Sequence, residues 1–267
     1  MRLCAQALGL SLGLLFLAAT GFAQTNPPSP AEEGVKDESD PTQSVFLSVR
    51  NEYFNLNGEA WTNALIVRSD RIVFRKRRRL GGKLGVLTRL DLPVVTTGLG
   101  GATHVGLGDL YAQALYVPWL SPRFALALGS GLTFPTATDR TLGGGKWRVV
   151  PTVAPIWFLP HRKGLFFIKA QQYVSFAGES DRAESNHLLT TPTLVRRVGS
   201  RWWILLDTEI RTDWERDNHT SFRSGFQVGR ILTPRFAIAV KPEIPWGGHR
   251  EGDFAVKTIF TWYRRRN

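Results

Sequence analysis

The chain has 267 residues, a formal net charge of +12 and one cysteine, Cys4, close to its N-terminus. This length suits one domain with terminal extensions, and a chain that loses Cys4 on export can form neither a disulfide nor a thiolate metal site. Beyond the N-terminal region, charged or other polar residues interrupt every apolar segment before it reaches the length of a membrane span. This excludes membrane-spanning helices and leaves a soluble β-protein or a membrane β-barrel.

The N-terminal segment has the pattern of a cleavable export signal. Arg2 precedes an apolar stretch from Ala7 to Ala19, which small residues follow at the expected cleavage site. The stretch is short for a helix that spans a bilayer. We therefore expect a signal peptide over residues 1–23. Residues 24–43 are rich in proline and charge and predict a disordered periplasmic tail, so the folded domain is expected over residues 44–263.

Twelve strands are predicted in this domain from the alternation of β-branched and aromatic residues with polar ones. The expected ranges are 44–55, 59–74, 83–94, 107–120, 123–134, 146–159, 164–177, 186–198, 201–214, 219–231, 235–245 and 253–263. The connections alternate between short turns, at 121–122, 161–163, 199–200 and 233–234, and longer loops, at 95–106, 135–145, 178–185 and 246–252. This asymmetry and the even strand number are typical of transmembrane antiparallel up-and-down β-barrels of the bacterial outer membrane.

Two of the short connections share the sequence Ser/Thr-Pro-Arg, at Ser121–Arg123 and Thr233–Arg235. Proline favours a tight reversal and cannot continue a strand. The number of strands between the two corners is even, so both are expected at the same rim. In an outer-membrane barrel, short turns lie on the periplasmic side.

The strand from Trp202 to Trp214 separates its two faces most clearly. One face is mainly apolar and ends in Trp at both positions, whereas the other carries Asp207, Glu209 and Arg211. A membrane barrel would turn the apolar face to lipid, and a soluble barrel or sandwich would turn it inward. Opposite charges close together on the polar faces favour the membrane barrel. So do the aromatic residues at predicted strand ends: Trp119, Phe124, Phe134, Trp147, Phe158, Phe176, Trp202, Trp214, Phe236 and Trp262.

The polar faces are therefore expected to line a lumen. Barrels of eight strands are filled by side chains and those of 16 to 18 enclose an aqueous channel, so twelve strands imply a narrow lumen. Opposed charges at similar depth would slow ions more than neutral polar molecules. The candidate lumen residues are Arg50, Glu52, Arg89, Asp91, Asp109, Arg148, Lys169, Gln171, Asp207, Glu209, Arg211, Asp213, Arg223, Gln227, Lys241, Glu243 and Lys257.

Several motifs fall where the longer loops meet the strands. They are, in order, Gly106-Leu-Gly-Asp109, Phe134-Pro-Thr-Ala-Thr-Asp139, Gly145-Lys-Trp147, Ser175-Phe-Ala-Gly178 with Asp181-Arg182, and Asp213-Trp-Glu215. The ordered set resembles the outer-membrane family described as Putative MetA-pathway of phenol degradation, and a weaker strand pattern extends the resemblance from about Asn63 to Trp262. The resemblance implies an exported barrel that passes or binds small hydrophobic or aromatic compounds, without catalytic activity. Arg264–Asn267 depart from the usual barrel ending, in which the terminal residue is aromatic.

The charged residues of these motifs have two interpretations. Asp139, Lys146, Asp181, Arg182 and Glu215 are expected first to brace the loops, through hydrogen bonds to loop amides and through ion pairs. Binding of a solute, or of a divalent ion among lipopolysaccharide phosphates, is the second interpretation.

Other kinds of site are disfavoured. The basic segment Arg75–Arg79 lacks the interleaved aromatic residues of a nucleic-acid site, and contact with anionic lipid is the better interpretation. A hydrolase needs a nucleophile and a base within reach, and no serine is evidently paired with His187. Gly143–Lys146 lacks the first glycine and the Ser/Thr of a phosphate-binding loop. We predict no enzyme activity, no metal site and no cofactor.

We therefore expect a passive outer-membrane channel for small solutes. Its expected partners are outer-membrane lipid and lipopolysaccharide, the barrel assembly machinery during biogenesis, and a solute that the sequence does not identify. One alternative is a closed structural or envelope-interaction barrel, filled by its own salt bridges or by the proline-rich tail. Another is a soluble periplasmic binding barrel.

Overall fold

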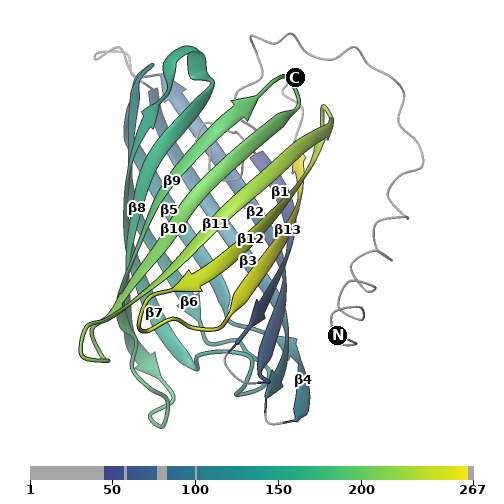
Figure 1. Cartoon of the computed structure of the whole chain (residues 1–267). Helices are drawn as coiled ribbons and strands as arrows, with labels where there is room; N and C mark the ends of the chain where they lie inside the picture. Colours follow the sequence, from purple (N-terminus) through teal and green to yellow (C-terminus); the bar gives the residue numbers. More distant parts are fainter. Residues whose placement is uncertain (1–44, 57–58, 77–82, 100, 264–267) are drawn as a thin grey trace. The chain divides into compact units, whose positions relative to one another are not determined.

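The computed structural model describes residues 45–56, 59–76, 83–99 and 101–263 (Figure 1). The predicted signal peptide and tail lie outside the described residues, as does most of the basic segment Arg75–Arg79. In the described part of the chain, no helix is long and apolar enough to span a membrane.

Thirteen strands are formed by the described residues. They are β1 (Val45–Asn55), β2 (Trp61–Lys76), β3 (Lys83–Leu99), β4 (Ala102–Leu107), β5 (Leu110–Leu120), β6 (Phe124–Phe134), β7 (Lys146–Phe158), β8 (Gly164–Gly178), β9 (Asn186–Val198), β10 (Trp202–Asp213), β11 (His219–Thr233), β12 (Phe236–Trp246) and β13 (Phe254–Tyr263). Apart from β4, the strands pair antiparallel in chain order, and β1 pairs with β13. The predicted twelve-stranded antiparallel barrel is therefore confirmed.

The predicted loop at 95–106 is wrong. β3 continues to Leu99, and β4 pairs with its outer half from Val94↔Leu107 to Leu99↔Ala102. Gly101 has a φ of 83°, a conformation that a β-hairpin turn can require and that glycine adopts without strain. The sequence did contain an indication of this hairpin, because Thr, Val and Leu alternate on both sides of the glycines. The hairpin lies at the long-loop end of the barrel, where Figure 1 labels β4.

The two Ser/Thr-Pro-Arg corners are hairpin turns at one rim, as predicted. The Ser121 amide donates to the Phe124 carbonyl at 2.8 Å, and the Ser121 hydroxyl accepts from the Phe124 amide at 3.0 Å. At the second corner the Thr233 hydroxyl accepts from the Arg235 amide at 3.3 Å. A register shift precedes each turn, and such bulges increase the local twist of the strand.

The register gives each strand an inward and an outward face. Along β10, Leu206 and its partner Phe226 on β11 are exposed, whereas Asp207 and Glu209 lie on the opposite face. Exposed aromatic residues form one band near the short turns and another near the long loops, among them Trp119, Trp157, Trp202, Trp262, Phe176, Trp214, Trp246 and Phe254. This apolar outside with two aromatic bands is the arrangement of a barrel surrounded by lipid.

One of the expected interfacial aromatic residues is placed differently. Phe158 packs against a cluster of buried apolar residues inside the barrel, whereas its neighbour Trp157 is exposed and contacts Phe124 and Phe166 outside. Successive residues of a strand point to opposite faces, so only one of these two aromatic residues can face lipid.

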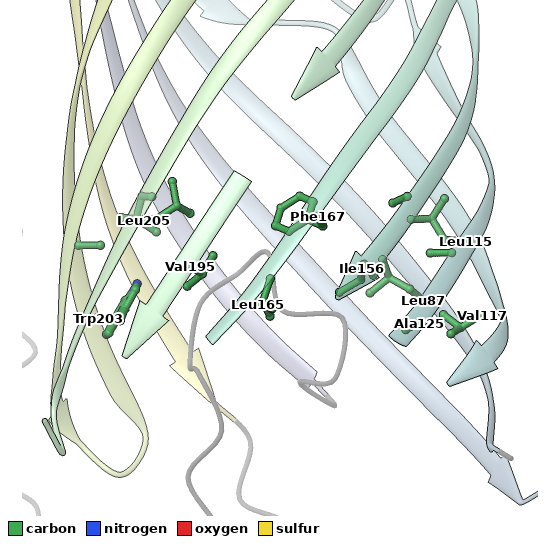
Figure 2. Close-up of a cluster of buried hydrophobic side chains, with 14 of the residues drawn as sticks. Leu87, Leu115, Val117, Ala125, Ile156, Leu165, Phe167, Val195, Trp203 and Leu205 are labelled. Carbon is green, nitrogen blue, oxygen red and sulfur yellow. The ribbon is translucent and has the colours of Figure 1, made fainter. Parts of the chain in front are cut away.

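The inward residues nearest the short turns are apolar, and we call them the inner layer. Val195 and Leu165 are at most 1% exposed (Figure 2). An open aqueous pore would leave inward side chains in contact with water, so the barrel is dry at this level. The inner layer comprises Leu87, Leu115, Val117, Ala125, Ala127, Ala154, Ile156, Leu165, Phe167, Val195, Trp203, Leu205, Ile231, Ala237, Ala239, Ile259 and Tyr263.

Candidate functional site

The polar interior begins directly outward of the inner layer. On β10 the inward residues change from Trp203 and Leu205 to Asp207 and Glu209, and the last of them, Arg211 and Asp213, lie at the end with the long loops. We call the level of Asp207 and Glu209 the middle layer and the long-loop end the outer mouth. The middle layer has charges on two walls and uncharged polar groups on a third.

The first charged wall is formed by β1, β2 and β3. The Arg68 guanidinium donates to both carboxylate oxygens of Asp91, at 2.7 and 2.6 Å, and Arg89 donates to both oxygens of Asp70, at 2.8 and 3.2 Å. On β1, the neighbour of β2, Arg50 pairs with Glu52 at 3.0 Å. Bidentate guanidinium–carboxylate pairs fix the geometry of both partners, so this wall is ordered by its own charges.

The second charged wall is formed by β10 to β13. The Lys241 ammonium lies 2.5 Å from Asp207 and 2.8 Å from Glu243, and the Lys257 ammonium lies 2.9 Å from Glu243. Arg223 pairs with Glu209, which faces it across β10 and β11, and with Glu243 at 3.2 Å. Every charge of this wall shares a partner with another, so the contacts of these four strands form one network.

The third wall, on β5 to β9, is uncharged except for Lys169. The Gln113 amide donates to the Thr152 hydroxyl at 3.1 Å, and the Gln171 amide lies 3.4 Å from both Thr152 and the Tyr111 hydroxyl. Lys169 is the next inward residue of β8 towards the inner layer, and it faces Thr191 on β9. This wall therefore offers hydroxyl and amide groups to the lumen.

The family-like motifs meet at the outer mouth. Asp109 lies in the short break between β4 and β5, and its carboxylate accepts from the Gly144 amide at 2.7 Å and the Ala137 amide at 3.3 Å. A Cβ on Gly143 would lie 2.4 Å from an Asp109 carboxylate oxygen, so glycine is needed for this approach. Arg148 reaches the same carboxylate at 3.4 Å. Asp109 thus ties both ends of the β6–β7 loop to the barrel wall.

A second group of contacts ties these loops to the connection between β8 and β9. The Lys146 ammonium pairs with Glu184 at 2.6 Å, and Arg182 donates to the Arg140 carbonyl at 2.6 Å. Hydrogen bonds from Lys146 and Ser175 lower the pKa of Glu184, so this carboxylate stays ionised near neutral pH. Asp181 pairs with Arg140 at 2.7 Å, a hydrogen bond that lowers its pKa as well.

These contacts give loop bracing a structural basis, although the partners differ from those expected. Asp181 and Asp139 do not pair with Arg182 or Lys146. Instead Asp139 accepts hydrogen bonds from the amide and hydroxyl of Thr141 within its own turn. For Glu215 the described contact is that of its backbone amide, which donates to Asp213 at 3.2 Å. Sequence could not supply these pairings, because they depend on how three loops fold together.

We expect Asp109→Ala to loosen the outer loops without preventing barrel formation. The change removes two amide acceptors and leaves the Arg148 guanidinium without this partner, while the strand ladders stay intact. Limited proteolysis of intact outer-membrane vesicles should cleave the 135–145 loop faster in this variant. Asp139→Ala is the matched control, since the hydrogen bonds of that carboxylate stay within its own turn and its other contact, with His104, is longer, at 3.8 Å. Equal cleavage rates for both variants would contradict the bracing role of Asp109.

A cavity of about 270 Å³ opens at the outer mouth between the ends of β10, β11 and the loop before β13. Arg211 forms ion pairs there with Asp213 and Glu251, both at 3.2 Å, and the rings of His219 and His249 stack at 3.9 Å. Arg216, Ser221 and Arg250 complete its lining. Within the described ranges, no three His, Cys, Asp or Glu side chains are placed to hold a metal ion together.

One serine does lie beside His187, contrary to expectation. The Ser185 hydroxyl is 3.1 Å from the His187 Nδ1 atom, a contact between residues two apart at the start of β9. The imidazole stacks flat on Tyr173 at 4.7 Å. Among the described residues no group hydrogen-bonds the other ring nitrogen, which a nucleophile–base pair normally uses for orientation.

The predicted lumen residues are placed by the structure as follows. Arg50, Glu52, Arg89, Asp91, Lys169, Gln171, Asp207, Glu209, Arg223, Gln227, Lys241, Glu243 and Lys257 lie on inward faces of the strands, whereas Asp109, Arg148, Arg211 and Asp213 lie at the outer mouth. The prediction missed Arg68 and Asp70, the buried partners of Asp91 and Arg89. The sequence indicated that Arg68 and Asp70 share the polar face of their strand, because they alternate with Val67 and Ser69.

The profile of the protein family described as Putative MetA-pathway of phenol degradation matches residues 74–242. Among solved structures, an outer-membrane channel from Pseudomonas putida F1 has a TM-score of 0.68 at 13% identity, over 85% of this chain and 99% of that one. The NanC porin has a TM-score of 0.55 at 11% identity over 82% and 100%, and the KdgM porin one of 0.52 at 10% over 83% and 100%. No curated protein matches the chain. At these identities the structural likeness shows the fold, that of outer-membrane β-barrels.

Proposed function

Since this chain belongs to the family described as Putative MetA-pathway of phenol degradation, we propose that it is a passive channel for small solutes in the bacterial outer membrane. The observation that carries the proposal is the distribution of polarity. Lys241, Glu243 and Lys257 are buried inside the barrel, whereas large apolar residues cover its outside. A polar interior running from the outer mouth to the inner layer has the chemistry of a solute pathway.

The inner layer supports small, partly apolar solutes. Its side chains, among them Phe167 and Ile156, would contact any molecule that crosses this level. A solute with an apolar or aromatic surface loses less free energy there than a fully hydrated ion does. The residues proposed to line the pathway are the inward set described above, which includes Arg68 and Asp70.

Planar-bilayer recording tests the channel. Refolded protein should give discrete conductance steps, and Arg211→Glu should shift the reversal potential in a salt gradient towards cation selectivity, because it reverses a charge at the outer mouth. Arg196→Glu is the control, since Arg196 is exposed on the outward face of β9 near the opposite rim. A shift of equal size in both variants would contradict the proposal, because it would show that ions do not pass Arg211 inside the lumen.

A closed structural barrel is the second candidate, and the nearly complete burial of the inner layer favours it. Folded protein, recognised by migration that changes on boiling, would then give no conductance steps in the same recordings. That outcome would rule out the channel and leave the closed barrel.

A further inference from the structure

Lys169 differs from the other cations of the middle layer. Arg68, Arg89 and Lys241 each contact a carboxylate, whereas Lys169 forms no salt bridge or hydrogen bond with any described residue. Its side chain also keeps part of its surface exposed, although its inward neighbours Gln171 and Phe167 are buried. Lys169 is therefore partly exposed, and no described carboxylate pairs with its ammonium group.

The charges across the lumen do not supply that counter-charge. The charges that act most strongly on the Lys169 ammonium are the guanidinium groups of Arg89, Arg68 and Arg50, together with the Glu209 carboxylate. Glu209 already pairs with Arg223 and Lys257. Of the described middle-layer residues, seven are cationic and six are anionic, namely Arg50, Arg68, Arg89, Lys169, Arg223, Lys241 and Lys257 against Glu52, Asp70, Asp91, Asp207, Glu209 and Glu243. One monovalent anion would balance this level.

The surroundings of Lys169 change character along β8. On the side of the outer mouth, the next inward residues are Gln171 and Tyr173, and the Tyr111 hydroxyl lies against Gln171. On the other side lies Phe167, whose partner across the strands is Ile156 of the inner layer. Lys169 thus lies at the boundary between the hydrogen-bonding groups of the middle layer and the apolar residues of the inner layer.

We infer that Lys169 binds the charged end of the solute, and that the solutes are small organic anions with an apolar body, such as aromatic carboxylates. The carboxylate would accept from the ammonium, with the Gln171 amide and the tyrosine hydroxyls as neighbouring polar groups, and the apolar body would rest on the inner layer. A hydrated inorganic anion would satisfy the charge but not the apolar floor. This inference rests on the proposed channel function for its biological role.

Equilibrium binding tests the site without requiring conduction. Line broadening of 4-fluorobenzoate in ¹⁹F NMR should report binding to the folded, detergent-solubilised full-length protein. Lys169→Met should weaken binding at least about tenfold, which corresponds to about 1.4 kcal/mol. Lys169→Arg should retain most of it, because the charge is kept. Unlabelled benzoate should displace the probe, whereas acetate and benzyl alcohol at equal concentration should displace far less.

The outcomes separate the site from the channel. Equal binding by wild type and Lys169→Met, or no binding by wild type, would overturn the inference while bilayer conductance could still stand. Displacement by acetate as strong as that by benzoate would overturn the apolar part of the assignment. Retention of the boiling-dependent migration by both variants excludes misfolding as the cause of a loss.

Discussion

Replacement of Trp203 by alanine is expected to raise the unit conductance and to destabilise the barrel. Trp203 belongs to the inner layer and is 4% exposed, and its indole occupies the space that a Cβ on Gly229 would need. Truncation of a buried tryptophan costs roughly 3–5 kcal/mol through lost burial and the cavity left behind. The same cavity widens the lumen at the inner layer, so single-channel recording should show larger conductance steps.

Trp202→Ala is the matched control, because Trp202 precedes Trp203 and lies outside the barrel. Its ring is 45% exposed and carries the Arg230 guanidinium 5.0 Å from its centroid. Loss of an interfacial ring should weaken membrane anchoring and leave the unit conductance unchanged. If the two variants conduct alike, the inner layer is not the constriction.

Glu243→Gln is expected to produce the second large effect. The Glu243 side chain is 1% exposed and contacts Lys241 at 2.8 Å, Lys257 at 2.9 Å and Arg223 at 3.2 Å. Neutralising it leaves three cations close together with fewer counter-charges, and breaking a buried ion pair in this way costs about 3–5 kcal/mol. The urea concentration at the midpoint of unfolding in lipid vesicles should fall accordingly.

Glu251→Gln provides the comparison for this prediction. Glu251 pairs with Arg211 at 3.2 Å, but its side chain is 55% exposed at the outer mouth. Exposed pairs contribute about 0–1 kcal/mol, so its unfolding midpoint should stay near that of the wild type. A midpoint for Glu243→Gln as high as that for Glu251→Gln would show that the network does not stabilise the barrel.

Most of the fold could be predicted because the residues of each strand alternate between two faces of different polarity. On β10 the change from Trp203 and Leu205 to Asp207 and Glu209 is already visible in the sequence. The strand count followed from period-two alternation and from turn residues such as Pro122. The β3–β4 hairpin was missed because glycine is uncommon in strands and favours a loop, which outweighed the alternation of threonine, valine and leucine beside the glycines.

The lumen was harder to predict than the wall. Sequence identified which residues face inward, but the layers arise from neighbours on different strands, at depths set by the register. The pairing of Arg89 with Asp70 and of Lys146 with Glu184 joins segments whose spacing carries no signal. The dryness of the inner layer likewise needs the packing of residues from many strands, as Phe158 illustrates.

The pairing of β1 with β13, the seam that closes the barrel, also joins two parts of the charge network. Hairpins between successive strands close short loops, whereas the seam joins Phe46 to Tyr263 and closes nearly the whole domain, which is the slowest kind of contact to make. Lys257 lies on β13 and faces Glu52 on β1, and it also reaches Glu209 and Glu243. Until the seam closes, Glu52 on β1 is separated from Lys257 on β13, so the step that closes the barrel also brings this carboxylate next to this ammonium group.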